Sequence, residues 1–368
     1  MPFGSHTLLL SLDGGLFGFG NNSQGQLGLG HAEQSAGEPL VVPWEGPRPV
    51  QVDWGSRHSL VLDEEGGVWE AGLSRSQTTS QAIQTFQRAK EIPPATFVSA
   101  GYFHSVALDT NGTLWVWTSC NYQSWSSLAM PIANLHPIVR VAGGINFLLA
   151  EDDRGDIWVI GNSPFGHSAL ESKAEVSVPT LVVIPGRSEG PLRCLGALQR
   201  GALLIDSQGF VWTAGNRYMG GLGRSGTKEE FKKVEGIPPM AWASCGYKHV
   251  LALDELGRVW TWGAGRDGQL GTEEAKDQTK PTHLAPVEGA IGVLAGYDHS
   301  LVFLANGDLL VFGWNHCGQL GFPSKTGTRQ LTPSLSSLLP ALPYPAPSRQ
   351  KSARFKDRKV NESSAWHR

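Results

Sequence analysis

The stretch His249–Gly263, HVLALDELGRVWTWG, has the pattern of a β-hairpin. Leu251 and Leu253 alternate with smaller residues, and the stretch ends in two tryptophans that are two residues apart. The residues between these halves, DELG, have the composition of a tight turn. Because alternate residues of a strand face the same side of a sheet, this pattern predicts two antiparallel strands with an apolar face.

The same pattern occurs seven times along the chain. The copies are separated by roughly 49 residues, which is the period of a propeller blade. A glycine follows fourteen residues after the first residue of most copies, and Gly161 of the fourth copy falls one residue later, which indicates a longer turn there. The first residues of the seven copies are His6, His58, His104, Asn146, Gly201, His249 and His299.

Each hairpin is preceded by a short apolar segment and followed by a glycine-rich loop and a further short segment, which predicts four strands per copy. Stacking such sheets radially buries both faces of each sheet. We therefore predict an all-β fold, a seven-bladed β-propeller with four-stranded antiparallel blades, formed by residues 1–322 as one domain. Residues 323–368 are predicted to form a Pro-rich, then basic, C-terminal tail that is mostly disordered.

Closure of the ring has three interpretations. Only five residues precede His6, so the strand that usually precedes the hairpin is absent from the first copy. Either a segment of residues 323–368 supplies a closing strand, or the first blade is incomplete, or this chain is a truncated product of a longer gene.

The charge is unevenly distributed. Residues 323–368 carry nine Lys and Arg residues and two Asp and Glu residues. Residues 1–322 carry 21 Lys and Arg residues and 31 Asp and Glu residues. An acidic propeller argues against direct nucleic-acid binding, because contacts to phosphates need clustered basic residues. Such binding is expected only weakly, through the basic tail. The cluster KSARFKDRK at 351–359 is either a nuclear-import or acidic-surface patch or merely a solubilising segment.

Four dispersed cysteines, without a C-x-x-C pair, favour reduced thiols and a cytoplasmic or nuclear protein. The chain has neither a signal-peptide pattern nor an apolar run of about 18 residues, so no membrane span is expected.

The loop after the hairpin recurs as GNNSQGQLG at 20–28, GAGRDGQLG at 263–271 and GWNHCGQLG at 313–321. Together with hairpins such as HSLVLDEEGGVWEAG at 58–72, these loops resemble the regulator of chromosome condensation repeat family over about residues 4–322. The resemblance implies a propeller used mainly for protein interaction, in a family that contains a Ran guanine-nucleotide exchange factor, an ultraviolet-B photoreceptor, ciliary scaffolds and parts of ubiquitin ligases. The second, third and fourth copies depart from the G-Q-L-G loop pattern.

Several candidate sites have a simpler structural explanation. GAGRDG at 263–268 matches a dinucleotide-binding pattern, but no helix follows it, and the same loop recurs in other copies. The repeated histidines lie one per blade, so they are expected to make scaffold hydrogen bonds rather than to hold a metal. We expect no catalytic residues, cofactor or metal. The hairpin tryptophans are expected in the core between blades: Trp69, Trp115, Trp117, Trp158, Trp212, Trp260 and Trp262.

Residues just before each repeated histidine vary and are expected at the mouth of the ring, where propellers often bind partners. Trp54 stands where other copies have small residues, and we expect its indole to be displaced toward this mouth beside Arg57. The alternative is that these are ordinary rim residues. The candidate protein-binding residues are Trp54, Arg57, Tyr102, Phe103, Tyr247, Lys248, Tyr297 and Asp298.

The sequence thus predicts a non-enzymatic protein-interaction propeller, a scaffold or adaptor in ubiquitin-ligase, ciliary or trafficking machinery. Its partner is expected to be a protein, such as a small GTPase or a ubiquitin-ligase component. The alternative is a guanine-nucleotide exchange factor for a Ran-like GTPase, although the position of the Ran exchanger's wedge, residues 119–127, is not lengthened here. A photoreceptor is disfavoured because the motifs GSRHS, GYFHS, GYKHV and GYDHS lack its tryptophans.

Overall fold

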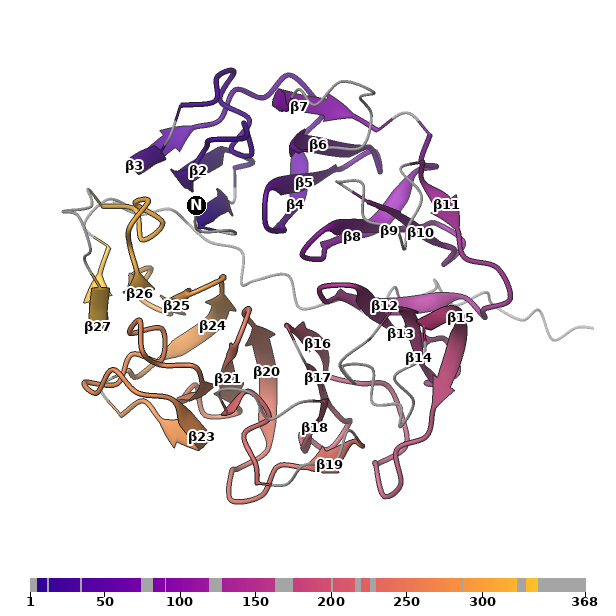
Figure 1. The fold of residues 1–368 in the computed structure, drawn as a ribbon, viewed down its shortest axis with the longest axis vertical. Helices are drawn as coiled ribbons and strands as arrows, with labels where there is room; N and C mark the ends of the chain where they lie inside the picture. Colours follow the sequence, from indigo (N-terminus) through magenta and orange to yellow (C-terminus); the bar gives the residue numbers. More distant parts are fainter. Residues whose placement is uncertain are drawn as a thin grey trace, which may run out of the picture.

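The chain forms a ring of β-sheets around a central axis, and it passes once around the ring (Figure 1). Each sheet is antiparallel, and six sheets have four strands while the sheet nearest the N-terminus has three. The prediction of an all-β, seven-bladed propeller is therefore confirmed. The computed structural model describes residues 5–11, 13–33, 35–73, 82–89, 91–118, 128–162, 175–199, 201–215, 220–225, 230–285, 287–322 and 329–336.

We number the sheets along the chain. The first to third sheets comprise β1 (His6–Leu10), β2 (Leu16–Asn21) and β3 (Ser35–Val41); β4 (Pro49–Trp54), β5 (His58–Asp63), β6 (Val68–Gly72) and β7 (Ile83–Arg88); and β8 (Ala95–Ala100), β9 (His104–Asp109), β10 (Leu114–Thr118) and β11 (Met130–Pro131). The fourth and fifth comprise β12 (Ile138–Gly143), β13 (Phe147–Asp152), β14 (Ile157–Asn162) and β15 (Glu175–Val182); and β16 (Cys194–Leu198), β17 (Gly201–Ile205), β18 (Val211–Gly215) and β19 (Lys232–Lys233).

The sixth and seventh sheets comprise β20 (Met240–Cys245), β21 (His249–Asp254), β22 (Val259–Gly263) and β23 (Gln278–His283); and β24 (Ala290–Ala295), β25 (His299–Leu304), β26 (Leu309–Trp314) and β27 (Arg329–Leu335). In Figure 1 the first strand of each four-stranded sheet lies nearest the axis and the last lies at the rim. We call the former the innermost strand. Apolar side chains fill the spaces between neighbouring sheets.

The turn of the hairpin is held by an aspartate at the end of its first strand. In the sixth sheet, the carboxylate of Asp254 accepts backbone N–H groups from Leu256 and Arg258 and the indole N–H of Trp260. The same three bonds form around Asp63, Asp109, Asp152 and Asp206. This spacing explains why the aspartate and the tryptophan six residues later recur together.

All seven hairpin tryptophans belong to the apolar clusters between sheets or pack against them, as predicted, but they are buried to different degrees. Trp117 and Trp262 are fully buried and Trp212 is nearly so, as expected for residues between sheets. The tryptophans that bond to the turn aspartates of the second, third, fourth and sixth sheets remain partly exposed: Trp69, Trp115, Trp158 and Trp260. These four tryptophans still pack against the apolar clusters between sheets, at their edges, and Trp212 makes the same bond to Asp206 while it is buried.

The repeated histidines are buried and contact the innermost strand's turn. At Gly296, an added Cβ atom lies only 2.1 Å from Cε1 of the His299 ring. A Cβ atom added at Gly55, Gly101 or Gly246 lies 2.3–2.5 Å from Cε1 of the corresponding histidine. The Gly-x-x-His pattern therefore records a close approach between the imidazole ring and a backbone that has no side chain.

We predict that Gly296→Ala lowers the free energy of unfolding by about 1–3 kcal/mol, because the new methyl group overlaps the His299 ring. Thermal denaturation measures the loss. The double variant Gly296→Ala, His299→Ala removes the overlapping ring. Its loss of stability is therefore expected to be smaller than the sum of the losses of the two single variants. Simple additivity contradicts the explanation.

The predicted alignment of the fourth copy is wrong by one residue. Phe147, not Asn146, occupies the histidine position, because Phe147 pairs with Gly161 as His58 pairs with Gly72. The turn that begins at Asp152 has the same length as the others. The expectation of a longer turn is therefore wrong, and Gly161 is in register.

The first sheet has three strands in the described part of the chain. The described C-terminal strand, β27, pairs with β26 at the rim of the seventh sheet and not with the first sheet. The strand β27 is the outer strand of the seventh sheet and lies beyond residue 322, the predicted end of the propeller. The tail beyond Ser336 lies outside the described residues.

Candidate functional site

Three tyrosines meet at the axis of the ring. Tyr102, Tyr247 and Tyr297 each lie two residues before a repeated histidine, in the turn that leaves an innermost strand. The rings of Tyr247 and Tyr297 stack with centroids 4.0 Å apart, and the ring of Tyr102 lies 5.4 Å from Tyr247 and 6.0 Å from Tyr297. We call these three residues the axial tyrosine cluster.

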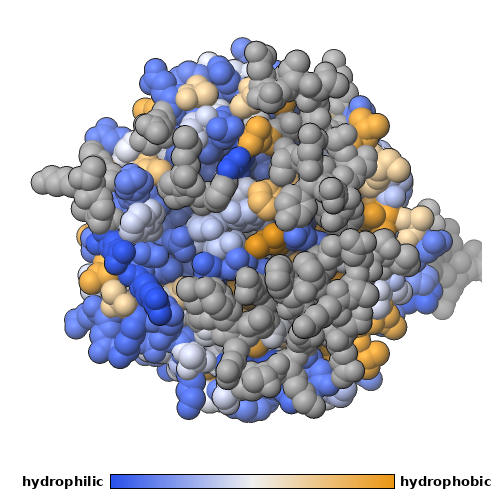
Figure 2. All heavy atoms as spheres, in the orientation of Figure 1, coloured by the Kyte–Doolittle hydropathy of each residue, from blue (hydrophilic) through white to orange (hydrophobic). Residues whose placement is uncertain are grey.

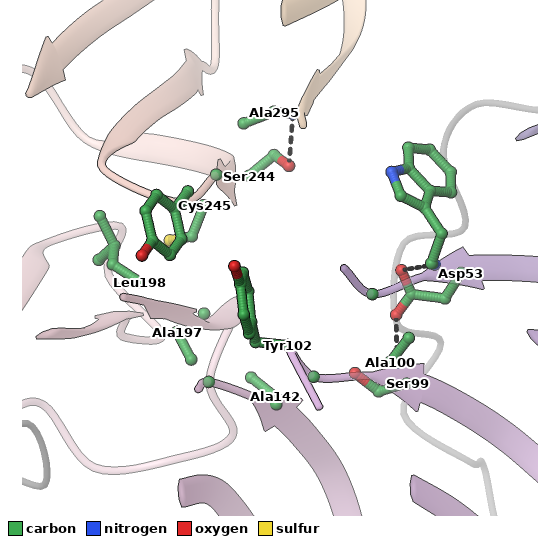
Figure 3. A pocket seen from close by; sticks show the side chains of 18 of the residues that line it. Asp53, Ser99, Ala100, Tyr102, Ala142, Ala197, Leu198, Ser244, Cys245 and Ala295 are labelled. Carbon is green, nitrogen blue, oxygen red and sulfur yellow. Dashed lines mark hydrogen bonds between the residues drawn. The ribbon is translucent and has the colours of Figure 1, made fainter. Parts of the chain in front are cut away.

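The cluster spans the axis. Its members come from the third, sixth and seventh sheets, and Figure 1 shows the third sheet across the ring from the other two. Tyr102 therefore contacts its partners from the opposite side. In Figure 3 its side chain projects into the middle of the pocket. The ring of Phe103 packs edge-on against Tyr102, with their centroids 4.3 Å apart.

Backbone hydrogen bonds between neighbouring sheets fix the turns that carry the cluster. The N–H of Tyr102 donates to Gly144 at 2.9 Å, and the carbonyl of Tyr102 accepts from Ser56 at 3.1 Å. The carbonyl of Tyr247 accepts from Gln199, whose side-chain amide also donates to the Tyr247 hydroxyl. The cluster is therefore held by the inter-sheet contacts of the ring rather than by free loops.

A cavity of about 300 Å³ lies along the axis, lined by the innermost strands of the second to seventh sheets. The cluster and Trp54 are among its lining residues. So is Asp53, which sequence reasoning missed. Its carboxylate accepts the N–H of Ala100 and of Trp54, both at 2.9 Å. Burial raises the pKa of Asp53 to about 6.

Asp53 could have been found by comparing the repeats. At the same position of the next four innermost strands, opposite the same residue of the second strand, stand Ser99, Ala142, Gly196 and Ser244. A carboxylate in a column of small residues is out of pattern in the same way as Trp54. Figure 3 shows Asp53 bridging to Ala100 of the neighbouring strand.

Charged groups surround the cluster. The ammonium of Lys248 lies 4.9 Å from the centre of the Tyr247 ring. Burial raises the pKa of Tyr102 to about 12 and also raises the pKa of Tyr297. Burial, together with the nearby Asp267 carboxylate, raises the pKa of Asp298 to about 6. Both tyrosine hydroxyls are therefore neutral at physiological pH and able to donate and accept hydrogen bonds.

The candidate residues thus fall into two groups. Trp54 and the axial tyrosine cluster line the axial cavity, whereas Arg57, Phe103, Lys248 and Asp298 do not line it. All eight are partly exposed. Trp54 packs against the apolar cluster between the first and second sheets, and its ring lies 6.5 Å from that of His6.

In the described ranges, no group of three or more His, Cys, Asp and Glu is placed to hold a metal ion. Cys194, Cys245 and Cys317 are free, and burial raises the pKa of Cys194 to about 12, so its thiol stays protonated. No helix in the same ranges is long and apolar enough to cross a bilayer. Residues 119–127, the position of the exchange-factor wedge, lie outside the described residues.

Figure 2 shows a mainly hydrophilic described surface on one face, with small separate hydrophobic areas, some of them near the middle.

Family models of the regulator of chromosome condensation (RCC1) repeat match the chain in both halves. One matches residues 13–62 and 257–303, and a second matches residues 95–117, 243–269 and 293–319. These ranges include the hairpins of the sixth and seventh sheets and the glycine-rich loops of the first and sixth sheets.

The chain is also similar in sequence to three known proteins. The chain is 32% identical over 157 residues to the mitochondrial RCC1 domain-containing protein RUG3 of Arabidopsis thaliana, covering 41% of this chain and 34% of that protein. It is 23% identical to the ultraviolet-B receptor UVR8 of the same plant, covering 63% of this chain and 56% of the receptor. It is 24% identical to the mouse secretion-regulating guanine nucleotide exchange factor, covering 67% of this chain and 62% of that protein. The chain thus spans less than two thirds of the length of these relatives.

Among solved structures, Prp20p of Saccharomyces cerevisiae superposes with a TM-score of 0.78 at 20% identity, covering 89% of this chain and 87% of Prp20p. Human WBSCR16 superposes with a TM-score of 0.76 at 18% identity, covering 87% of this chain and 93% of WBSCR16. At these identities the similarity shows a shared propeller fold.

Proposed function

Because this chain belongs to the regulator of chromosome condensation (RCC1) repeat family, we propose that it is a non-enzymatic protein-interaction propeller, a scaffold or adaptor that binds its partner at the axial tyrosine cluster. The single observation that carries the proposal is the contact of Tyr102, from the third sheet, with Tyr247 and Tyr297 from the far side of the ring. Tyrosine is enriched among residues that dominate binding energy, and it gains contact area at low conformational cost.

The surroundings of the cluster support a polar rim around this aromatic centre. The ammonium of Lys248 lies over the Tyr247 ring. The carboxylate of Asp298 interacts electrostatically with both Lys248, which lowers its pKa, and Asp267, which raises its pKa. Interfaces commonly place aromatic anchors at the centre and charged groups at the edge. Arg57, Phe103 and Trp54 extend the proposed surface.

Affinity purification from the source cells, with the purified partner then titrated against variants, tests the proposal. Tyr102→Ala and Tyr247→Ala are each expected to weaken binding at least tenfold, because each removes an aromatic anchor from the centre of the surface. Trp54→Ala combined with Arg57→Ala is also expected to weaken it.

The matched control is Leu256→Ala. Leu256 is 76% exposed in the turn between β21 and β22, at the other end of these strands from the cluster. Its loss is expected to leave affinity unchanged. Folded tyrosine variants that bind as tightly as this control contradict the proposed surface.

A second candidate is guanine-nucleotide exchange on a Ran-like small GTPase. It is favoured by the similarity to the mouse exchange factor over 289 residues, and the structure of Prp20p was described with its binding to Gsp1p and histones. A nucleotide-release assay on any GTPase recovered with the chain separates the candidates. Accelerated release supports exchange, and binding without release supports the scaffold.

The partner class is part of the proposal. The human ligase HERC6 is 27% identical over 287 residues that make up 26% of its length, so a ubiquitin-ligase component is one expected partner alongside a GTPase. We propose that the chain acts in the cytoplasm or nucleus.

A further inference from the structure

The wall of the axial cavity carries a single carboxylate. The described residues that line the cavity come from the C-terminal halves of six innermost strands and from the turns that follow these strands. Asp53 is the one Asp or Glu among these lining residues, and none of them is Lys, Arg or His. Asp53 is also partly exposed, so its side chain is accessible to a ligand.

The groups that contact Asp53 do not neutralise its charge. Its carboxylate accepts the N–H groups of Trp54 and Ala100, and a side-chain hydrogen bond from Ser99 lowers its pKa. No described residue forms an ion pair with it. The ring of His6 lies 6.5 Å from that of Trp54, but burial lowers the pKa of His6 to about 3, so this histidine is neutral.

Asp53 is mostly ionised at pH 7, because its pKa is about 6. A carboxylate in a partly dehydrated wall is costly unless a cation lies beside it. A cationic ligand therefore gains free energy at this wall, and an anionic ligand loses it.

The rim outside the cavity carries charges of both signs. The basic residues Arg57 and Lys248 are accompanied by the carboxylates of Asp267 and Asp298. Asp298 interacts electrostatically with both Lys248 and Asp267, and Tyr102 is influenced by both Arg57 and Asp298. Because these four groups balance in number, the unbalanced charge lies in the cavity wall.

Aromatic rings stand at the same end of the axis as this carboxylate. Trp54 and the axial tyrosine cluster line the cavity together with Asp53. In Figure 3 Tyr102 projects into the pocket, while Asp53 lies at the wall that β4 and β8 form. The faces of aromatic rings attract cations, and their area packs against alkyl stems. The cavity thus combines a carboxylate with rings that suit a cation on an apolar stem.

The carboxylate lies at a depth that a long side chain reaches. Ser99 of β8 occupies the position of Asp53 in β4, since each pairs with the third residue of the following strand. Tyr102 follows Ser99 by three residues, so at about 3.3 Å per residue the two levels are at most about 10 Å apart. The cavity, at about 300 Å³, is near the lower limit for ligand sites and suits a single side chain.

The hydrogen bonds of Asp53 favour an ammonium over a guanidinium. One carboxylate oxygen accepts the N–H of Trp54 and the other accepts the N–H of Ala100. A guanidinium fork uses both oxygens at once, whereas an ammonium donates to one. We propose that the axial cavity binds the ammonium group of a lysine, which the partner protein inserts past the axial tyrosine cluster to Asp53. This inference rests on the proposed function, because the partner is the protein that binds this cluster.

The repeat itself supplies the matched variant. Ser244 of β20 occupies the position of Asp53, and its hydroxyl accepts the N–H of Ala295 at 2.9 Å, as Asp53 accepts that of Ala100. Asp53→Ser is therefore expected to keep the contact between neighbouring sheets and to remove the charge. An unchanged melting temperature verifies that the variant is folded.

N-acetyl-lysine methylamide tests the site without a partner. On titration, we expect this probe to shift the amide resonances of Trp54 and Ala100 in the full chain and to leave them unshifted in Asp53→Ser. N-acetyl-norleucine methylamide, which has an alkyl stem without the charge, is expected to shift neither. No shift with the lysine probe, equal shifts with the two probes, or an equal response of the variant overturns the ammonium site. A stronger response to calcium chloride than to the lysine probe overturns it in favour of a metal ion.

The partner from the affinity purification tests the same site in the complex. Asp53→Ser is expected to weaken its binding at least about tenfold, because a hydrogen bond between charged groups is lost. Leu256→Ala again serves as the unaffected control. If Tyr102→Ala weakens binding and Asp53→Ser does not, the proposed surface stands and the inserted lysine is overturned. If neither variant weakens binding, both proposals are overturned.

Discussion

Trp262→Ala is expected to lower the free energy of unfolding by about 3–5 kcal/mol, the range for removing a fully buried tryptophan. The side chain of Trp262 is 0% exposed and its indole N–H donates to the carbonyl of Gly221 at 3.2 Å, so it joins the sixth sheet to the loop of the fifth. An added Cβ at Gly223 lies 2.9 Å from its ring nitrogen, which shows how closely this space is filled.

Thermal denaturation measures the effect, expected as a fall of about 5–10 °C in Tm. Trp260→Ala is the matched control, because Trp260 lies two residues away on the same strand but is partly exposed beside Asp254. Its loss is expected to cost about 1–2 kcal/mol. Equal shifts in Tm for the two variants contradict the conclusion that Trp262 is buried between sheets while Trp260 lies at the edge.

Acid is expected to unfold the propeller, with a midpoint between about pH 4 and pH 6. Burial lowers the pKa of His6, His58 and His249 to about 3 and of His104 and His299 to about 4, against 6.5 in an unfolded chain. A histidine with a lowered folded pKa contributes stability above pH 6.5 and loses it as the pH falls toward the folded value. At pH 5 the loss is about 2 kcal/mol per histidine.

Two carboxyl groups act in the opposite direction. The pKa values of Asp53 and Asp298 are raised to about 6, so their destabilising effect disappears as they become protonated. Two such groups do not offset five histidines, and the net effect of acid remains a loss of several kcal/mol.

Circular dichroism during acid titration measures the midpoint, and His58→Phe tests its cause. The fourth sheet already has Phe147 at this position, so the substitution removes a titrating group in a form that the fold accepts. The variant is expected to unfold at lower pH than the wild type. His136→Gln, at an exposed position, is expected to have no effect. If His58→Phe leaves the midpoint unchanged, the buried histidines do not drive acid unfolding.

The repeat carried most of the fold prediction, because each hairpin signal is local. Asp254, its turn and Trp260 lie within seven residues, and their mutual hydrogen bonds require no distant partner. The one misaligned copy shows the limit of matching by residue type. Phe147 fills a histidine position, and the glycines three residues before it and fourteen residues after it, Gly144 and Gly161, show the register in the sequence.

The candidate site was predictable as a set of positions but not as a geometry. The sequence by itself determined that Tyr102, Tyr247 and Tyr297 occupy equivalent turns at the mouth of a seven-bladed ring, because the repeat period fixes each residue's place within its blade. Only the tertiary structure decided that their rings contact one another, that Asp53 lines the same cavity, and that β27 is the outer strand of the seventh sheet. These features depend on the ring's diameter and on contacts between residues far apart in sequence, which no local pattern encodes.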